Sequence, residues 1–269
     1  MLPVDSPFAR VVRLGRTGST NADLRAAALA DPPAWPHGAV LVADHQDAGR
    51  GRAGRTWQTP AGTALTASVL LRPGVPAETF GWLPLLVGLA VQRATSALVP
   101  GAGVSVKWPN DVVAAGAGDD DVEGWGHVRK LAGILVEALP APPPAAVAGI
   151  GVNVAQSAGE LPVPWATSLR LLGSRAEVPE VLDAVGGELM PLLRRWSAAG
   201  GDVETAGLHA EVSAACTTLG TDVRVDLPGG SGPSGRAVGL DRNGHLLVDT
   251  GEAVTAVAAG DVHHLRAAG

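Results

Sequence analysis

Short apolar segments of strand length alternate with helix-forming segments through about residue 215, and this alternation limits the possible folds. It predicts an α+β (α/β) domain in which helices cover a β-sheet. Ser19, Thr20 and Asn21 are preferred helix N-caps and precede an alanine-rich segment. The expected strands are 10–14, 39–43, 65–71, 104–107, 111–114, 130–139 and 146–154. The expected helices are 22–30, 82–98, 180–199 and one after residue 203.

The pattern changes after Leu219, where short runs alternate apolar and polar residues. These runs are 223–227, 235–240, 245–249 and 253–258. Asn243-Gly244 between two of them predicts a hairpin whose two central residues both have positive φ. We therefore expect two domains, residues 1–218 and a small all-β module, residues 219–269.

Composition excludes several classes of protein. No apolar run approaches the roughly 18–20 residues of a membrane span. The N-terminus lacks the pattern of a signal peptide, so we expect a cytoplasmic protein. The net charge of −6 argues against nucleic-acid binding. The single cysteine, Cys216, excludes an internal disulfide framework and a multi-cysteine zinc site. We interpret Cys216 as a small buried residue.

Lysine and asparagine are rare in this chain. Of 20 Lys and Arg residues only two are lysines, Lys107 and Lys130, and asparagine occurs only at positions 21, 110, 153 and 243. Arg cannot replace a compact ammonium group, and Asp cannot replace a neutral amide. The few lysines and asparagines that occur despite this rarity are candidates for functional roles, unless they are present by chance.

A loop at residues 46–57 combines three arginines, Arg50, Arg52 and Arg55, with three glycines, and it ends in Trp57. Glycines let the backbone approach a ligand closely, and guanidinium groups bind carboxylates or phosphates bidentately. The alternatives are an exposed basic loop and an RNA-binding Gly-Arg segment. The loop is short and flanked by strands, so we favour an ordered anion-binding loop.

Residues 107–111, Lys-Trp-Pro-Asn-Asp, place an ammonium, an amide and a carboxylate at one turn. Asp111 is suited to Mg²⁺, Asn110 to a ligand oxygen and Lys107 to phosphate charge. An ordinary Asn-Asp turn with Trp108 packed in the core explains the same residues, and both interpretations stay open here.

Two further segments are ambiguous when each is taken alone. Lys130 begins the apolar strand 130–139, where a lysine is costly unless it has an anionic partner or reaches solvent. Residues 149–153, Gly-Ile-Gly-Val-Asn, end the next strand. They lack the longer fingerprint of a dinucleotide-binding loop.

These motifs, in this order, resemble the biotin–protein ligase family. The matching segments are 19–21, 49–57, 107–111, 130–134 and 149–153, and the resemblance continues more loosely to the C-terminal module. The family fold is a mixed β-sheet with flanking helices, related to class II aminoacyl-tRNA synthetases, plus a small SH3-like barrel. The same two-domain organisation is expected from the sequence pattern.

The resemblance implies a ligase that uses ATP and Mg²⁺ and acts in two steps. The biotin carboxylate attacks the α-phosphate of ATP to give biotinyl-5′-AMP and pyrophosphate. A lysine of a biotin carboxyl carrier domain then attacks the adenylate and releases AMP. Both steps collect negative charge on phosphate oxygens, which explains a need for cationic side chains.

The resemblance also assigns residues to roles. Lys130, Arg50 and Arg52 would be catalytic, and Asp111 would hold Mg²⁺. The nucleotide would be bound by Arg52, Arg55, Trp57, Lys107, Asn110, Asp111 and Asn153. Biotin would be bound by Ser19, Thr20, Asn21, Gln46, Gly49, Arg50, Gly51, Arg52, Lys130 and Gly133.

Two departures from the family pattern matter. Bifunctional members carry an N-terminal winged helix-turn-helix, whereas the first motif here begins by residue 19, so we expect no repressor role. The acidic loop 118–126 is longer than the usual hairpin before residue 130, and its role stays open.

Other functions and oligomeric states also stay open at this point. The rival enzyme is a lipoate or octanoate ligase, and the rival of another class is a DNA- or biotin-sensing protein without catalysis. Family members occur as monomers and as homodimers.

Overall fold

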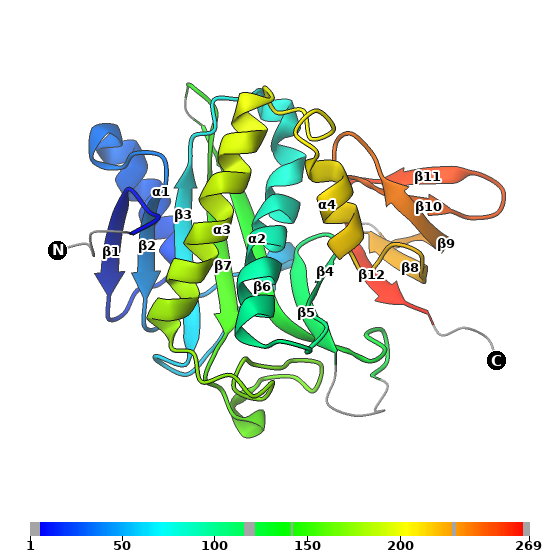
Figure 1. The fold of residues 1–269 in the computed structure, drawn as a ribbon, viewed down its shortest axis with the longest axis horizontal. Coiled ribbons are helices and arrows are strands. Elements are labelled where there is room, and N and C mark those ends of the chain that lie inside the picture. The colour runs from blue at the N-terminus through cyan, green and yellow to red at the C-terminus, as the bar shows by residue number, and fades with distance from the viewer. Residues whose placement is uncertain (1–5, 116–121, 141, 228–229, 266–269) are drawn as a thin grey trace.

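The computed structural model describes residues 6–115, 122–140, 142–227 and 230–265, and most of its strands form a seven-stranded sheet (Figure 1). In sheet order the strands are β1 (Arg10–Leu14), β2 (Ala39–Ala43), β3 (Ala64–Leu71), β7 (Ala145–Asn153), β6 (Val128–Leu139), β5 (Asp111–Ala115) and β4 (Ser105–Lys107). The strands β1 and β2 are parallel to each other, and every other neighbouring pair in this sheet is antiparallel. The predicted mixed sheet is confirmed.

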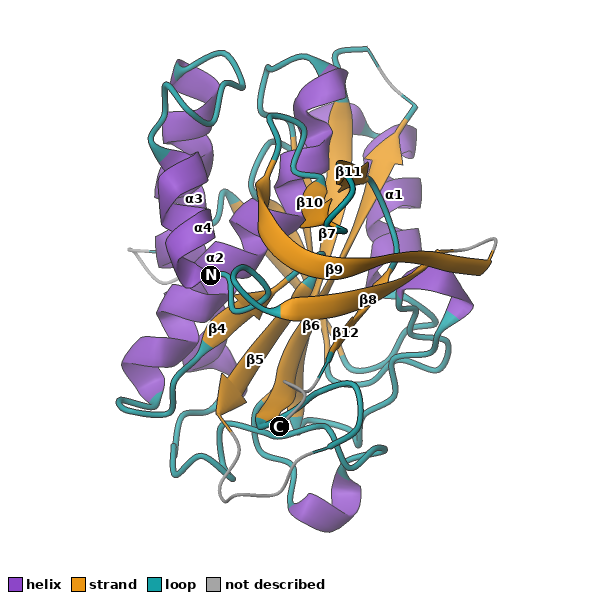
Figure 2. Ribbon diagram, turned by 90° about the vertical axis from the view of Figure 1, so that its right-hand side faces the viewer, coloured by secondary structure: helices purple, strands orange, loops and turns teal. Residues whose placement is uncertain are grey.

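In the described part of the chain, four α-helices flank this sheet on both faces (Figure 2). Two of them, α2 and α3, pack against each other on one face, and α1 packs against β2, β3 and β7 on the other. The helices are α1 (Thr20–Ala30), α2 (Leu83–Leu98), α3 (Val178–Ala198) and α4 (Leu208–Ala215). The helices predicted from the sequence pattern are therefore present, with small differences at their ends.

The strand β2, second in the sheet order, illustrates why the sheet is covered on both sides. Successive side chains of a strand point to opposite faces. Val40 and Val42 belong to the core under α2 and α3, whereas Ala39 and Leu41 belong to the core under α1. Both faces are therefore buried, which explains the unbroken apolar sequence of this strand.

The start of α1 is fixed by its cap. The side chain of Ser19 accepts a hydrogen bond from the backbone N–H of Ala22, at 3.5 Å, and Ser19 has an extended backbone. The predicted N-cap is therefore confirmed, and it sets the positions of Thr20 and Asn21 on the first turn, which is buried.

Residues after 219 form a separate five-stranded antiparallel sheet, consistent with the SH3-like module of the family. In sheet order the strands are β11 (Val254–Val257), β10 (Leu246–Asp249), β9 (Gly230–Leu240), β8 (Asp222–Leu227) and β12 (Asp261–His264). The sequence pattern did not predict β12, which pairs with β8.

The Asn243-Gly244 hairpin is confirmed, but its expected turn type is wrong. Of these two residues only Gly244 has a positive φ, +80°. The Asp241 carboxylate accepts hydrogen bonds from the backbone N–H groups of Asn243 and His245, at 2.7 and 2.9 Å. This side chain shapes a longer loop than the two-residue turn that was expected.

Two buried indoles attach this hairpin to the larger sheet. Trp82 donates from Nε1 to the carbonyl of Arg242 at 2.8 Å, and Trp108 donates from Nε1 to the carbonyl of Gly244 at 3.0 Å. Both side chains are almost fully buried, so each satisfies its one polar group across the contact between the sheets. The C-terminal sheet is thereby held beside the turn that precedes β5.

Among the described residues, no helix combines the length and the apolar character that are needed to cross a membrane.

Candidate active site

A cavity of about 570 Å³ opens between the larger sheet, the loop 46–57 and the C-terminal sheet. Fifteen of the sixteen residues that sequence analysis assigned to a site line it: Ser19, Thr20, Asn21, Gln46, Arg50, Gly51, Arg52, Arg55, Trp57, Lys107, Asn110, Asp111, Lys130, Gly133 and Asn153. Gly49 is the exception. A Cβ at this glycine would collide with the carbonyl oxygen of Trp57, so Gly49 permits a close backbone approach beneath the cavity.

One end of the cavity is a network of hydroxyl and amide groups. Gln46 Oε1 accepts hydrogen bonds from the backbone N–H and the hydroxyl of Thr20, at 2.7 and 3.0 Å. The amide of Asn21 donates to Glu137 Oε2 at 2.7 Å, and its oxygen lies 2.6 Å from the hydroxyl of Ser68. These contacts fix the orientation of the side chains on the first turn of α1.

The two glycines of the Gly-Ile-Gly segment on β7 make room for side chains of the site. A Cβ on Gly149 would lie 2.6 Å from Asn21 Oδ1, and a Cβ on Gly151 would lie 2.5 Å from the indole of Trp57. Both distances are shorter than real carbon contacts allow. The two glycines therefore allow Asn21 and Trp57 to pack closely against the sheet, and the segment is a strand rather than a phosphate-binding loop.

The loop 46–57 is closed on itself by backbone hydrogen bonds. Gly51 N donates to the carbonyl of Arg55 at 2.7 Å, and Trp57 N donates to the carbonyl of Gly49 at 2.9 Å. This arrangement turns the indole of Trp57 onto the sheet and leaves the side chain of Arg50 exposed. The loop therefore presents arginines and one aromatic ring at the edge of a single cavity.

Lys130 and Asp111 meet in the middle of the cavity. Lys130 Nζ lies 2.7 Å from Asp111 Oδ1 and 6.0 Å from the centroid of the Trp57 ring. Neither side chain of the ion pair is fully buried, with 23% and 14% exposed, so both can reach a ligand. A lysine at the start of this apolar strand needs either an anionic partner or contact with solvent, and Asp111 is that partner.

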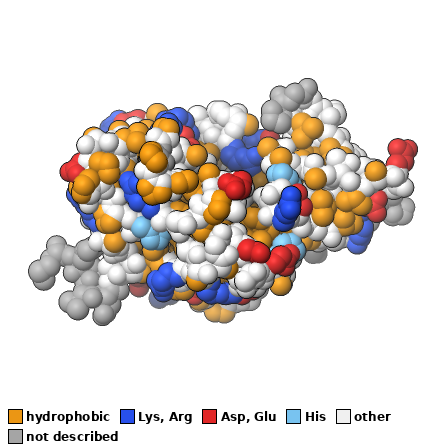
Figure 3. Space-filling model, turned by 90° about the horizontal axis from the view of Figure 1, so that it is seen from above, with side chains coloured by type: hydrophobic (Ala, Val, Ile, Leu, Met, Phe, Trp, Pro, Cys, Tyr) orange, Lys and Arg blue, Asp and Glu red, His pale blue; other side chains and the backbone are white. Residues whose placement is uncertain are grey.

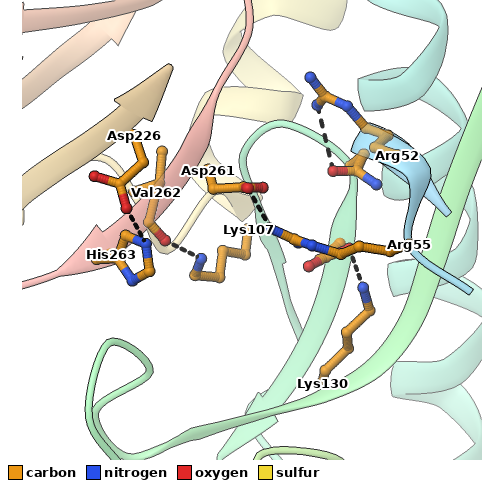
Figure 4. Close-up of polar contacts among 10 residues, drawn as sticks. Arg52, Arg55, Lys107, Lys130, Asp226, Asp261, Val262 and His263 are labelled. Atoms are coloured by element: carbon orange, nitrogen blue, oxygen red, sulfur yellow. Dashed lines mark hydrogen bonds and ion pairs between the residues drawn. The ribbon is translucent and has the colours of Figure 1, made fainter. Parts of the chain in front are cut away.

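Lys107 is the second lysine and is only 4% exposed. Its Nζ donates to the carbonyl of Val262 at 2.5 Å (Figure 4). The same Nζ lies 4.7 Å from the centroid of the Trp125 ring. Burial lowers the pKa of Lys107, with the charge of Asp111 acting in the opposite direction. Among the described residues no carboxylate lies within ion-pair distance of this ammonium, so the position favours an anionic ligand.

Arg52 and Arg55 approach the same region from the loop. Arg52 donates to Asn110 Oδ1 at 3.4 Å, and Arg55 forms an ion pair with Asp261 of β12 (Figure 4). Burial lowers the pKa of Arg52, although a guanidinium keeps its charge at neutral pH. The nearby carboxylates of Asp111 and Asp261 oppose that shift.

Two asparagines of the cavity are already hydrogen-bonded within the protein. Asn110 donates from Nδ2 to the carbonyl of Ile134 at 2.9 Å. Asn153 donates to the carbonyl of Thr167 at 2.9 Å and accepts from Gln156 at 3.1 Å. Both amides therefore hold backbone segments around the cavity, in addition to lining it.

Several residues of the cavity were not predicted from the sequence. Asp261, Val262 and His263 come from β12, and Trp125 and Trp165 come from loops. The segment 261–264 has one apolar residue between polar ones, which is too little alternation to predict a strand. The role of the acidic loop 118–126 was left open by the sequence. Its first four residues lie outside the described part, but residues 122–126 form a turn packed against β12.

Cys216 lies outside this cavity and is 6% exposed. Burial raises the pKa of its thiol, although backbone hydrogen bonds from Thr218 and Leu219 oppose the shift. The expectation of a small buried residue is confirmed.

Comparison with known proteins matches both parts of the chain. The model of the biotin/lipoate A/B protein ligase family matches residues 16–153, and that of the biotin protein ligase C terminal domain matches residues 218–265. A biotin--[acetyl-CoA-carboxylase] ligase of Mycobacterium tuberculosis is 41% identical over 259 residues, which cover 94% of this chain and 88% of the relative.

Two solved structures are also similar. The biotin protein ligase from Aquifex aeolicus, in complex with biotin and ATP, has a TM-score of 0.74 and 28% identity, over 97% of this chain and 100% of the other. The biotin protein ligase from Leishmania major, in complex with biotinyl-5-AMP, has a TM-score of 0.59 and 25% identity, over 96% and 99%. This chain belongs to the biotin/lipoate A/B protein ligase family, on its biotin–protein ligase branch.

Proposed function

We infer that this chain is a biotin–protein ligase that joins biotin to a lysine of an acceptor protein at the expense of ATP. In the first step a carboxylate oxygen of biotin attacks the α-phosphate of ATP, the bond to pyrophosphate breaks, and biotinyl-5′-AMP forms. In the second step the amine of the acceptor lysine attacks the carbonyl of this mixed anhydride, loses a proton, and displaces AMP.

One observation carries the proposal. The only two lysines of the chain reach the same cavity with different partners, Lys130 on Asp111 and Lys107 on the carbonyl of Val262. Both reacting groups of the first step are anions that repel each other. Two largely buried ammonium groups offset that repulsion and hold the carboxylate close to the phosphate.

The hydroxyl and amide end of the cavity is assigned to biotin. A ureido group presents two donors and one acceptor, and Thr20, Asn21 and Gln46 offer both kinds of partner. We assign biotin binding to the full predicted set, Ser19, Thr20, Asn21, Gln46, Gly49, Arg50, Gly51, Arg52, Lys130 and Gly133. Within this set Gly49 acts indirectly, because it does not line the cavity and instead allows the close approach of the Trp57 carbonyl within the loop 46–57.

The other side of the cavity is assigned to the nucleotide. Lys107, Arg52 and Arg55 supply positive charge for phosphates, and Trp57 supplies an aromatic face. Asn110, Asp111 and Asn153 complete the predicted set. Arg50, Arg52 and Lys130 are the proposed catalytic residues, because they are cations of the loop 46–57 and of strand β6 that line the same cavity.

Magnesium fits this site as a partner of the nucleotide. Among the described residues no group of three His, Cys, Asp or Glu side chains forms a closed metal cage. Mg²⁺ commonly uses one or two carboxylates together with phosphate oxygens and water. Asp111 is the carboxylate that we assign to it, and the ion would neutralise phosphate charge when bound.

The proposal extends to partners and domains. The acceptor is the biotin carboxyl carrier domain of a biotin-dependent carboxylase, and residues 1–218 and 219–269 are the two domains. On the face in Figure 3, basic and acidic side chains of the described residues are interspersed, and the net charge is −6. We therefore expect no nucleic-acid partner for this chain.

Release of pyrophosphate tests the reaction class. The purified chain with Mg-ATP should release pyrophosphate when biotin is added and not when lipoate is added. Release with lipoate alone would identify a lipoate ligase instead. Biotin binding without pyrophosphate release would identify a binding protein, and in that case Lys130→Ala would leave biotin binding unchanged.

A further inference from the structure

The turn at residues 122–126 is built into the wall of the cavity. Trp125 N and Gly126 N both donate to the carbonyl of Val122 at 2.8 Å, which closes the turn. The backbone N–H of His264 donates to the carbonyl of Gly124 at 3.3 Å, and a Cβ on Gly124 would lie 2.7 Å from His263 Nδ1. The C-terminal sheet therefore supports this turn.

The turn supplies Trp125 to an aromatic pair. The rings of Trp125 and Trp165 are stacked, with centroids 6.2 Å apart and an angle of 14° between the planes. Both residues line the cavity, and the ammonium of Lys107 lies 4.7 Å from the centroid of Trp125. The backbone N–H of Lys130 donates to the carbonyl of Trp165 at 2.7 Å, so the pair lies at the start of β6.

Contacts along β6 give the order of the groups in the cavity. Asn21 donates to the carbonyl of Leu135, Trp57 lies against Gly133, and Trp165 contacts Lys130. The five residue-to-residue steps from Leu135 to Lys130 span about 17 Å of extended strand. The amide end and the indole pair are therefore at opposite ends, with the lysines and Trp57 between them.

We propose that Trp125, stacked on Trp165, binds the base of the nucleotide, so that the turn 122–126 is part of the ATP site. This proposal rests on the proposed function, which assigns the amide end to biotin and the lysines to the reacting carboxylate and phosphates. Trp57 already offers the nucleotide one aromatic face, and the base is the part of the adenylate that can use a second one. It is flat and aromatic, and an indole pair beside a cation suits it by stacking.

The variants Trp125→Ala and Trp125→Phe test this assignment, with Trp35→Phe as a control outside the cavity. In the pyrophosphate assay, Trp125→Ala should raise the KM for ATP by about 5- to 100-fold, as expected for loss of one stacking contact. The KM for biotin should change by less than about threefold, and Trp125→Phe should recover most of the loss. Unchanged thermal unfolding would show that each variant is folded.

Inorganic tripolyphosphate separates the base from the phosphates, because it carries the charge without the ring. Its inhibition of the reaction should be equal in the wild type and in Trp125→Ala. An unchanged KM for ATP would overturn the proposal. A rise confined to the KM for the acceptor would also overturn it, and would assign the indole pair to acceptor binding.

A second readout does not depend on biotin. Titration of the protein with Mg-ATP alone should change the tryptophan fluorescence of the wild type and of Trp35→Phe, with a weaker apparent affinity in Trp125→Ala. If the wild type binds Mg-ATP in this way but releases no pyrophosphate with biotin, the proposed function fails while the base site stands. Equal affinities in the wild type and Trp125→Ala would contradict the base site itself.

Discussion

Lys130 Nζ lies 2.7 Å from Oδ1 of Asp111, so one of the two lysines is paired with an acid inside the cavity. An ammonium group has three donors, so the ion pair with Asp111 leaves donors for substrate oxygens. The carboxylate therefore orients the lysine without consuming its capacity to bind. Lys107 has no such acid among the described residues, and the two lysines are suited to different anions.

Loss of the Lys130 charge should reduce adenylate formation. Lys130→Ala removes a charge-assisted hydrogen bond, and we expect kcat for pyrophosphate release to fall by at least about 10- to 100-fold. Lys130→Arg keeps the charge but changes its geometry, so it should recover only part of the rate. Equal rates for the alanine variant and the wild type would remove Lys130 from the reaction.

Arg52 should retain the adenylate between the two steps. Arg52→Ala deletes a clamp worth about 1.5–3 kcal/mol, so biotinyl-5′-AMP should dissociate about 10- to 100-fold faster. The measurement is release of radiolabelled adenylate from a preformed complex. An off-rate equal to that of the wild type would exclude this role for Arg52.

Gly151→Ala should displace Trp57 from the sheet. The new Cβ would meet the indole at 2.5 Å, and overpacking of this kind typically costs about 1–3 kcal/mol. We expect a lower midpoint of urea unfolding and a higher KM for ATP. Gly187→Ala, in α3, is the matched control, because its Cβ would have no neighbour within 4 Å and alanine favours a helix. If both variants behave alike, the contact between Gly151 and Trp57 has no role.

His264 should make the protein sensitive to mild acid. Burial, together with the charges of Lys107 and His263, lowers the pKa of His264 to about 4. Histidine in an unfolded chain titrates near 6.5, so the unfolded state binds this proton first as the pH falls. The stability is fully present above about pH 6.5 and is lost as the pH falls through about 4.

The variant His264→Gln tests the contribution of this histidine. From pH 7 to pH 5 its free energy of unfolding should fall by about 1–2 kcal/mol less than that of the wild type, measured by urea denaturation. An equal fall in both proteins would show that other groups account for the acid sensitivity.

Periodicity predicted the larger sheet because its strands are buried and strongly apolar. The run at 39–43, for example, is buried on both faces. The start of α1 was predictable for another reason, because its N-cap residue, Ser19, is a signal in the local sequence. The strand β12 escaped prediction because its sequence, Asp-Val-His-His, has little pattern of its own and becomes a strand by pairing with β8. Because β12 was not predicted, the contribution of the C-terminal sheet to the cavity was not predicted either.

The sequence predicted which residues form the candidate site, but not which of them contact each other. Fifteen of the sixteen proposed residues line one cavity. They could be predicted because the type and the order of residues in each motif are visible in the sequence. No local pattern indicates that Lys107 contacts the carbonyl of Val262 or that Trp125 stacks on Trp165. These contacts join segments far apart in the chain, and only the packing of the two sheets brings them together.

Transfer of biotin to a carrier domain tests the central claim most directly. The purified chain is incubated with biotin, Mg-ATP and a folded apo carrier domain, and the carrier is analysed by mass spectrometry. We predict that one lysine of the carrier gains biotin in the presence of ATP and that Lys130→Ala abolishes most of this transfer. A folded carrier that stays unmodified with the wild-type chain would contradict the assignment.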